Sequence, residues 1–230
     1  AATCTRTMKL NDRRALSSWG PARRFPWRDT SDPYRLVVTE LMLVRTRAEQ
    51  VARMWGEFFE RFPTLVALQR ATDDEISSSL RSLGLRWRIQ RIIEFVRASN
   101  ANRPLVDQLS SVPGAGRYVT DAVRVGSAGY GILPVDVTIA RVLTRYYGIA
   151  VTTEPRRDRG VVERAVAFGS VDRSFFHSIL DLAALVCQPR RPQCMRCPIV
   201  SGCAYFALGR RLQLPGATAL AGTEASDAAS

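Results

Sequence analysis

The chain has 230 residues, and its 33 Lys and Arg against 21 Asp and Glu give a formal net charge of +12. Hydrophobic residues at 46% and charged residues at 23% exclude a wholly disordered basic protein. The apolar runs are too short for a membrane helix, and the first residues lack the apolar segment of a secretory signal. We therefore expect a globular protein without a membrane partner, whose excess positive charge meets a polyanion.

The basic residues are almost all arginine, because Lys9 is the only lysine. Arginine can hold a phosphate with two parallel hydrogen bonds, although a GC-rich genome alone would also explain the bias. A mechanism that forms a Schiff base must use Lys9 or the terminal amine. The single histidine, His177, excludes multi-histidine metal sites, and its apolar helical surroundings indicate a structural role.

Apolar residues recur at helical spacing along most of the chain. The periodic segments are 36–44, 51–59, 72–83, 89–96, 105–111, 118–125, 137–147, 160–168 and 174–186. Thr72 and Glu75 have the spacing of a capping box, and Gly84 is expected to end that helix. No convincing alternating strand pattern is present, so we predict an all-α fold. Residues 207–230 lose the periodicity and are expected to form a disordered tail.

Four of the five cysteines crowd into one short stretch near the end of the periodic region. They are Cys187, Cys194, Cys197 and Cys203, in C-x6-C-x2-C-x5-C spacing. In a chain without a secretion signal, such crowding favours a metal site over disulfides. Four thiolates can hold zinc or an iron–sulfur cluster, and general chemistry leaves that choice open. The fifth, Cys4, is isolated and is not an expected ligand.

A glycine-containing turn, Val112-Pro113-Gly114-Ala115-Gly116, lies between two helical segments. Two glycines two positions apart allow a tight turn and a close backbone approach to a ligand. Backbone N–H groups at the start of the next helix then suit a phosphate. An ordinary corner between two helices is the alternative interpretation.

Two carboxylates stand out near apolar helix patterns. Asp136 directly precedes the segment Val137–Tyr147, which is the usual place of an N-cap. Glu40 lies on an apolar helix face, where an unpaired carboxylate is costly. A structural capping or salt-bridge role for Glu40 is the alternative to a role in a binding pocket.

Together, the cysteine spacing, the glycine turn and the V-D-x-x-x-x-R-V context of Asp136 resemble one family. They are similar to the iron–sulfur helix–hairpin–helix DNA glycosylases, which include endonuclease III and the adenine and mismatch thymine DNA glycosylases. The resemblance covers residues 8–206 and implies a [4Fe-4S] cluster on the four cysteines. It implies a six-helix barrel over 29–139, with the helix–hairpin–helix at about 105–125, and a cluster domain of 8–28 plus 140–206.

The resemblance also implies roles for individual residues. Asp136 matches the catalytic aspartate, Glu40 a pocket residue that hydrogen-bonds or protonates the extruded base, and Tyr118 a further pocket position. A core aromatic role is the alternative for Tyr118. The residues expected at DNA are Arg45, which fills the gap left by the flipped base, together with Val112, Gly114, Gly116, Arg117, Arg190, Arg191 and Arg196.

Tyr118 also indicates the reaction subtype, because it follows G-x-G-R where endonuclease III has its Schiff-base lysine. The mismatch thymine glycosylases resemble this chain in having tyrosine there. Few residues follow the cysteine loop, so we expect no domain of the kind that reads 8-oxoguanine in adenine glycosylases. The resemblance therefore implies a monofunctional glycosylase that flips out and hydrolyses thymine or uracil mispaired with guanine.

We accordingly expect a monomer that acts on double-stranded DNA containing a mispaired or damaged base. The expected location is the cytoplasm, at the nucleoid of a bacterial or archaeal cell. Two alternatives are an adenine DNA glycosylase that lacks the 8-oxoguanine-reading domain, and a non-catalytic iron–sulfur module that binds damaged DNA.

Overall fold

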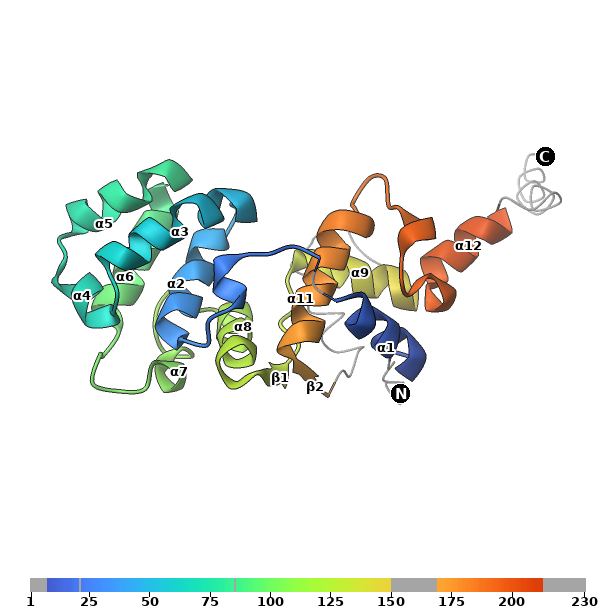
Figure 1. Cartoon of the computed structure of the whole chain (residues 1–230), viewed down its shortest axis with the longest axis horizontal. Helices are drawn as coiled ribbons and strands as arrows, with labels where there is room; N and C mark the ends of the chain where they lie inside the picture. The colour runs from blue at the N-terminus through green and yellow to red at the C-terminus, as the bar shows by residue number, and fades with distance from the viewer. Residues whose placement is uncertain (1–7, 21, 85, 150–168, 213–230) are drawn as a thin grey trace, which may run out of the picture.

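The computed structural model describes residues 8–20, 22–84, 86–149 and 169–212. They form two lobes joined side by side, with the shared helix α8 (Arg117–Ala128) near the junction (Figure 1). The fold is mostly helical, as predicted. The helix expected over 160–168 lies outside the described residues.

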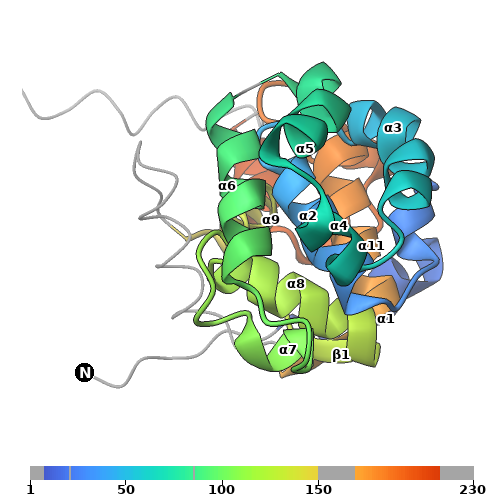
Figure 2. The same ribbon diagram turned by 90° about the vertical axis from the view of Figure 1, so that its left-hand side faces the viewer.

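The first lobe is built from short helices that follow one another along the chain. They are α2 (Pro33–Leu43), α3 (Ala48–Arg61), α4 (Leu65–Arg70), α5 (Asp73–Leu80), α6 (Arg86–Ala98) and α7 (Leu105–Gln108), with the 3-10 turns η1 (Pro26–Arg28) and η2 (Arg81–Leu83). Seen from the end of the lobe, α3, α4, α5 and α6 are arranged around α2 (Figure 2). The central helix α2 therefore has apolar side chains on most of its surface.

The second lobe combines segments from both ends of the chain. It contains α1 (Leu10–Trp19), α9 (Val137–Tyr147), α11 (Arg173–Asp181), one π-helical turn η3 (Leu182–Val186), the 3-10 turns η4 (Cys194–Arg196) and η5 (Val200–Gly202), and α12 (Ala204–Leu212). The segment after α1 crosses from the second lobe to the first (Figure 1). Buried Asp12 of α1 accepts hydrogen bonds from Tyr146 of α9 and from Ser201 of η5, which tie these segments together.

Each lobe has its own apolar core. The first core includes Phe25 and Trp27 of the crossing segment and a group of aromatic side chains on α3. The second core includes Leu16, Ile139 and Phe175. Helix α8 contributes to both cores, because successive residues of a helix face different directions.

Close packing of α8 on α2 explains one glycine at this junction. A Cβ atom added to Gly126 would lie 2.8 Å from a methyl carbon of Leu36, which is closer than real side chains approach. The missing side chain at position 126 thus allows the two helices to pack directly against each other. Their contact is one wall of the cavity described below.

Local sequence signals account for where several helices begin. The Asp32 carboxylate caps α2 by accepting from the Tyr34 N–H at 2.9 Å, and Pro33 follows at the first helical position. The predicted capping box of Thr72 and Glu75 is present at the start of α5. Gly84, with a φ of 87°, follows η2 as predicted.

Two details differ from the expectations. A short antiparallel pair joins β1 (Tyr130–Ile132) to β2 (Ser170–Asp172), with Gly131 opposite Val171. Strands of three residues are too short for alternation to be recognised in the sequence. The tail expected from residue 207 is also wrong at its start, because α12 continues to Leu212, where Ala, Leu and Arg residues favour the helix although Gly209 does not.

None of the described helices is long and apolar enough to cross a membrane.

Candidate active site

A cavity of ≈ 390 Å³ lies at the junction of the lobes, within the usual range of ligand pockets, roughly 300–1,000 Å³. Glu40 of α2, Tyr118 of α8 and Asp136, which precedes α9, all line it. These three residues were the predicted catalytic set, and the fold brings them together from three separate elements. Arg45 also lines the cavity.

Asp136 is held in place by the helix that it caps. Its carboxylate accepts from the backbone N–H of Thr138 at 2.9 Å and of Ile139 at 2.7 Å, and from the Thr138 hydroxyl at 2.8 Å. The N-cap interpretation is therefore correct as geometry. The same carboxylate borders the cavity, so the cap fixes a negative charge at its wall.

Glu40 and Tyr118 both line the cavity, and each side chain influences the ionisation of the other. Burial raises the pKa of Glu40 to about 8, with a further upward contribution from the negative charge of Asp136. Burial, Glu40 and Asp136 together hold the pKa of Tyr118 well above its ordinary value. At neutral pH the pair therefore offers a neutral carboxylic acid and a neutral phenol beside an aspartate.

Arg45 lies in a tight turn after α2 and is exposed. Its φ of 55° is the only positive value for a non-glycine residue among the described residues. Its guanidinium lies 5.8 Å from the ring centre of Trp87, which is 40% exposed and also faces Arg91 at 5.5 Å. A side chain in such a strained turn points to a functional constraint.

A buried arginine supports that turn. Arg88 is 1% exposed and donates to the Val44 carbonyl at 2.7 Å, the Met42 carbonyl at 3.2 Å and the Leu83 carbonyl at 2.6 Å. It thus joins the end of α2 to the segment before α6. The sequence analysis missed Arg88, because an arginine on an amphipathic helix is usually exposed.

The glycine turn adopts the expected tight conformation directly before α8. Gly114 has a φ of 90°, and a Cβ atom there would lie 3.4 Å from the Arg91 carbonyl oxygen. Gly116 is the N-cap of α8, and Arg117 is exposed at its first position. Val112 is buried in the first core, so its side chain is not available to a partner.

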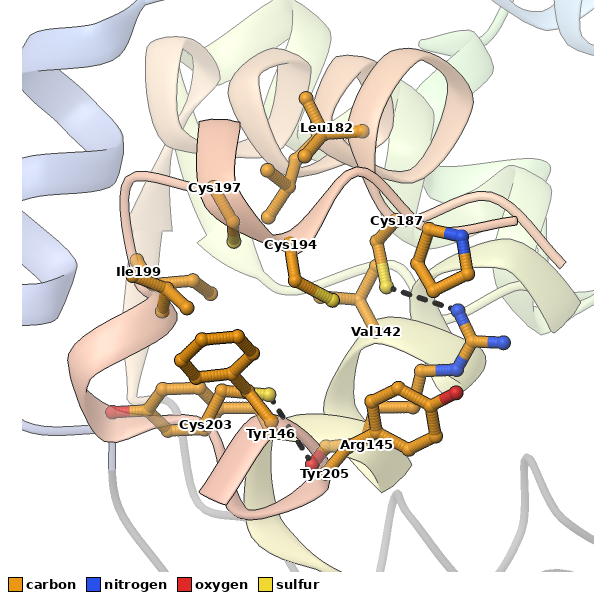
Figure 3. Close-up of a pocket in the computed structure, with 14 residues that line it drawn as sticks. Val142, Arg145, Tyr146, Leu182, Cys187, Cys194, Cys197, Ile199, Cys203 and Tyr205 are labelled. Carbon is orange, nitrogen blue, oxygen red and sulfur yellow. Dashed lines mark hydrogen bonds between the residues drawn. The ribbon is translucent and has the colours of Figure 1, made fainter. Parts of the chain in front are cut away.

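The four cysteines line a second pocket, in the second lobe (Figure 3). No three Cys, His, Asp or Glu side chains of the described chain are close enough together to hold a single metal ion. Burial raises the pKa of Cys197 to about 11. A metal that bound this thiol would therefore have to displace its proton.

Two arginines of α9, the helix that Asp136 caps, donate hydrogen bonds to the cysteine loop. Arg141 donates to the Cys187 carbonyl at 3.0 Å and to the Ala183 carbonyl at 2.9 Å. Arg145 approaches the Cys187 Sγ atom at 3.5 Å and donates to the Gln188 carbonyl at 2.7 Å (Figure 3). The position of the cysteine loop is therefore coupled to α9.

The three arginines predicted at DNA from the cysteine loop are all exposed, but they do not line the cavity. They are Arg190, Arg191 and Arg196. Arg196 donates to the Gln193 side-chain oxygen at 2.7 Å. The structure thus places these residues on a surface of the second lobe, apart from the carboxylates.

The cavity has a further wall that the sequence analysis missed. Buried Asp181 of α11 accepts from the Nε of Arg23 at 2.7 Å and from both terminal nitrogens of Arg28, at 2.7 and 2.8 Å. Both arginines line the cavity, as does half-buried His177. His177, for which the sequence indicates a structural role, therefore also borders the candidate site.

Comparison with known proteins agrees with this arrangement. Residues 38–163 match the description "HhH-GPD superfamily base excision DNA repair protein". The chain belongs to the HhH-GPD superfamily. A thymine/uracil-DNA glycosylase of Methanothermobacter thermautotrophicus is 30% identical over 203 residues, which cover 83% of this chain and 90% of that protein.

Other members of the HhH-GPD superfamily are also similar. The structure of a thermostable thymine-DNA glycosylase matches with a TM-score of 0.73 and 26% identity, covering 86% of this chain and 97% of that one. An adenine DNA glycosylase of Mycolicibacterium smegmatis is 30% identical over 88% of this chain and 71% of that protein. The family predicted from the motifs is confirmed, and so is its fold.

Proposed function

We propose that the chain is a monofunctional DNA glycosylase that excises thymine or uracil mispaired with guanine in duplex DNA. The observation that carries this proposal is that Glu40, Tyr118 and Asp136 all line the same cavity. The similarity to thymine and uracil glycosylases supports the choice of base.

The reaction begins with extrusion of the nucleotide, because a base inside a duplex is out of reach of a protein cavity. Mispaired bases cost less to extrude, which contributes to selectivity. Arg45, exposed on a strained turn at the cavity, then occupies the space that the base has left. Its cation–π contact with Trp87 holds it ready near that position.

Cleavage of the N-glycosidic bond develops positive charge on the sugar and negative charge on the leaving base. The fixed carboxylate of Asp136 stabilises the sugar cation and orients the attacking water. Glu40, neutral at pH 7 because of its raised pKa, donates its proton to the departing base. The two carboxyl groups thus take different roles because their surroundings differ.

Binding of the duplex itself is assigned to basic and backbone groups around the cavity. The glycine turn at Gly114 and Gly116 presents the start of α8 to a phosphate, with Arg117 exposed beside it. Arg190, Arg191 and Arg196 add positive charge on the second lobe. We infer a single copy of the chain on each lesion, in a bacterial or archaeal nucleoid.

The cysteine pocket fits a [4Fe-4S] cluster held by Cys187, Cys194, Cys197 and Cys203. The donor set is four thiols that line one pocket, and four thiolates are the usual ligands of a [4Fe-4S] cluster. When bound, the cluster supplies structural stabilisation of the cysteine loop. Arg141 and Arg145 then transmit that order to α9.

The proposed function is tested with duplexes that each contain one lesion or mispair. We expect single-turnover excision from T:G and U:G duplexes, and little from A:8-oxoguanine or oxidised-pyrimidine duplexes. Preferential release of adenine would support the adenine glycosylase alternative. Tight binding to these duplexes without release of any base would support the non-catalytic alternative.

A further inference from the structure

Most polar side chains that line the cavity interact with another side chain or with the backbone of the described residues. Arg23 and Arg28 are paired with Asp181. Glu40 interacts with Tyr118, Asp136 accepts hydrogen bonds from the start of α9, and Arg45 lies over the ring of Trp87. These contacts leave one polar side chain of the cavity to be explained.

His177 makes no hydrogen bond with any described residue, and its contact with Phe176 is through the rings. It extends from α11 in the second lobe, whereas Glu40 and Tyr118 belong to α2 and α8. A polar group at a cavity wall that has no hydrogen-bond partner among the described residues is available to a ligand or to water. The extruded base, which enters this cavity, is the ligand it would meet.

The surroundings determine the charge of that ring. Burial lowers the pKa of His177 to about 4, helped by the positive charges of Arg28 and Arg173 and opposed by Asp181. A neutral imidazole has one N–H donor and one nitrogen acceptor. The neutral ring can therefore donate a hydrogen bond to a neutral base without adding a further positive charge beside Arg28 and Arg173.

We propose that His177 is a base-recognition residue whose imidazole N–H donates to a keto oxygen of the extruded pyrimidine. This inference rests on the proposed function and specifies how the same cavity selects its base. Thymine and uracil carry two keto oxygens, whereas adenine carries none. The same hydrogen bond stabilises negative charge that develops on these oxygens as the base departs.

The test measures binding to duplexes that cannot be cleaved. One contains 2′-fluoroarabino-uridine opposite guanine, and the other contains a tetrahydrofuran abasic analogue opposite guanine. His177→Phe keeps a ring and removes both nitrogens. We expect it to bind the uridine duplex about tenfold more weakly and the abasic duplex as well as the wild type does.

Two further variants separate recognition from folding. His177→Gln restores a side-chain N–H donor and should recover part of the lost affinity for the uridine duplex. Ser174→Ala changes an exposed residue of the same helix that does not line the cavity, and should match the wild type on both duplexes. Equal affinity of His177→Phe and wild type for the uridine duplex would overturn the proposal. So would an equal loss on both duplexes, which would indicate a structural role.

A third duplex, containing 2′-fluoroarabino-adenosine, distinguishes failure of this inference from failure of the proposed function. Wild-type preference for the adenosine duplex over the uridine duplex contradicts the proposed function and the keto-oxygen contact together. If the wild type prefers the uridine duplex and His177→Phe retains that preference unchanged, only the assignment of His177 fails.

Discussion

Asp136 joins an observed task, the capping of α9, to the catalytic task that we propose for it, and both need a fixed side chain. Two backbone N–H groups of α9 and the Thr138 hydroxyl hold the carboxylate, and a fixed charge stabilises a transition state without having to reorient. The cap could be predicted because its signal lies within a few neighbouring residues, whereas the catalytic role is implied by the family resemblance and stays a prediction. The sequence alone did not place Glu40 and Tyr118 beside it.

Asp136→Asn separates the two tasks. Asparagine is as good an N-cap as aspartate, so the fold and DNA affinity should change little. We expect the single-turnover excision rate to fall at least about a hundredfold, because the negative charge is lost. Asp172→Asn is the matched control, since Asp172 caps α11 by accepting from the Phe175 N–H at 2.7 Å but does not line the cavity. Near-wild-type excision by Asp136→Asn would leave that residue as a cap only.

Glu40 should make both stability and activity depend on pH. Its pKa is about 8 in the folded protein and lies near 4.3 in an unfolded chain, so the folded state binds the extra proton between these values. The free energy of unfolding contributed by this group therefore falls as pH rises from about 4 to 8. Glu40→Gln removes the titration. We expect its melting temperature to exceed that of the wild type by a margin that grows over this pH range.

Activity offers an independent measurement of the same residue. If neutral Glu40 is the proton donor, wild-type excision should decline above pH of about 8. Glu40→Gln cannot transfer a proton, so it should be slower at neutral pH and lack that decline. A wild-type profile that stays flat through pH 9 would contradict the role of Glu40 as an acid.

At the scale of elements, helix starts were predictable because they depend on neighbouring residues. The capping box at Thr72 and the proline at the start of α2 are examples. The π-helical turn Leu182–Val186 was not predictable, because its sequence continues the ordinary apolar pattern of α11. Buried Arg88 was also missed, because two of its three carbonyl partners, Met42 and Val44, lie 46 and 44 residues away in sequence.

Arg88 and Arg97 provide a matched pair of arginines on α6. Both donate to backbone carbonyls, but Arg88 is buried and Arg97 is exposed, where it binds the Gln69 and Ala71 carbonyls. Arg88→Met leaves three carbonyls without their donor, each a loss of roughly 1–3 kcal/mol. We expect denaturant unfolding to show a loss of at least about 3 kcal/mol for Arg88→Met and about 1 kcal/mol for Arg97→Met. Similar losses for both would show that burial of Arg88 adds nothing.

At the scale of the whole molecule, the cavity depends on contacts between segments far apart in the chain. Asp181 lies 158 residues from Arg23 and 153 from Arg28 in sequence, and no local pattern connects them. The position of His177 at the cavity was not predictable for the same reason, because α11 faces the cavity only once the lobes pack. The four cysteines, in contrast, could be grouped from the sequence because they lie within one short stretch; the structure places them around one pocket, and their role as cluster ligands stays a prediction.

The cysteine set leads to a prediction about metal content. The purified protein should be brown, with broad near-ultraviolet and visible absorption and about four irons per chain. Cys197→Ser should lose the colour and much of the iron, whereas Cys4→Ser, outside the motif, should keep both. Stoichiometric zinc without iron, after anaerobic preparation, would rule out the cluster.

The lysine content of the whole chain leads to a prediction about strand cleavage. A lyase needs an amine that attacks the sugar carbon and forms an imine. Tyr118 lines the cavity with a phenol that cannot form an imine, and Lys9 lies outside the cavity, before α1. We therefore expect excision to leave an abasic strand that breaks only on treatment with alkali or heat. Borohydride should trap little or no covalent protein–DNA adduct.

Two variants show what each outcome means. Tyr118→Lys places an amine in the cavity and should introduce an adduct that borohydride traps, because the side chain faces the same space as Asp136. Robust trapping by the wild type, at the rate of base release, would overturn the monofunctional assignment. Loss of that trapping in Lys9→Ala would identify Lys9 as the nucleophile, and its persistence would point to the terminal amine. Lys9 is the only lysine in the 230 residues, so a lysine nucleophile within this sequence could only be Lys9.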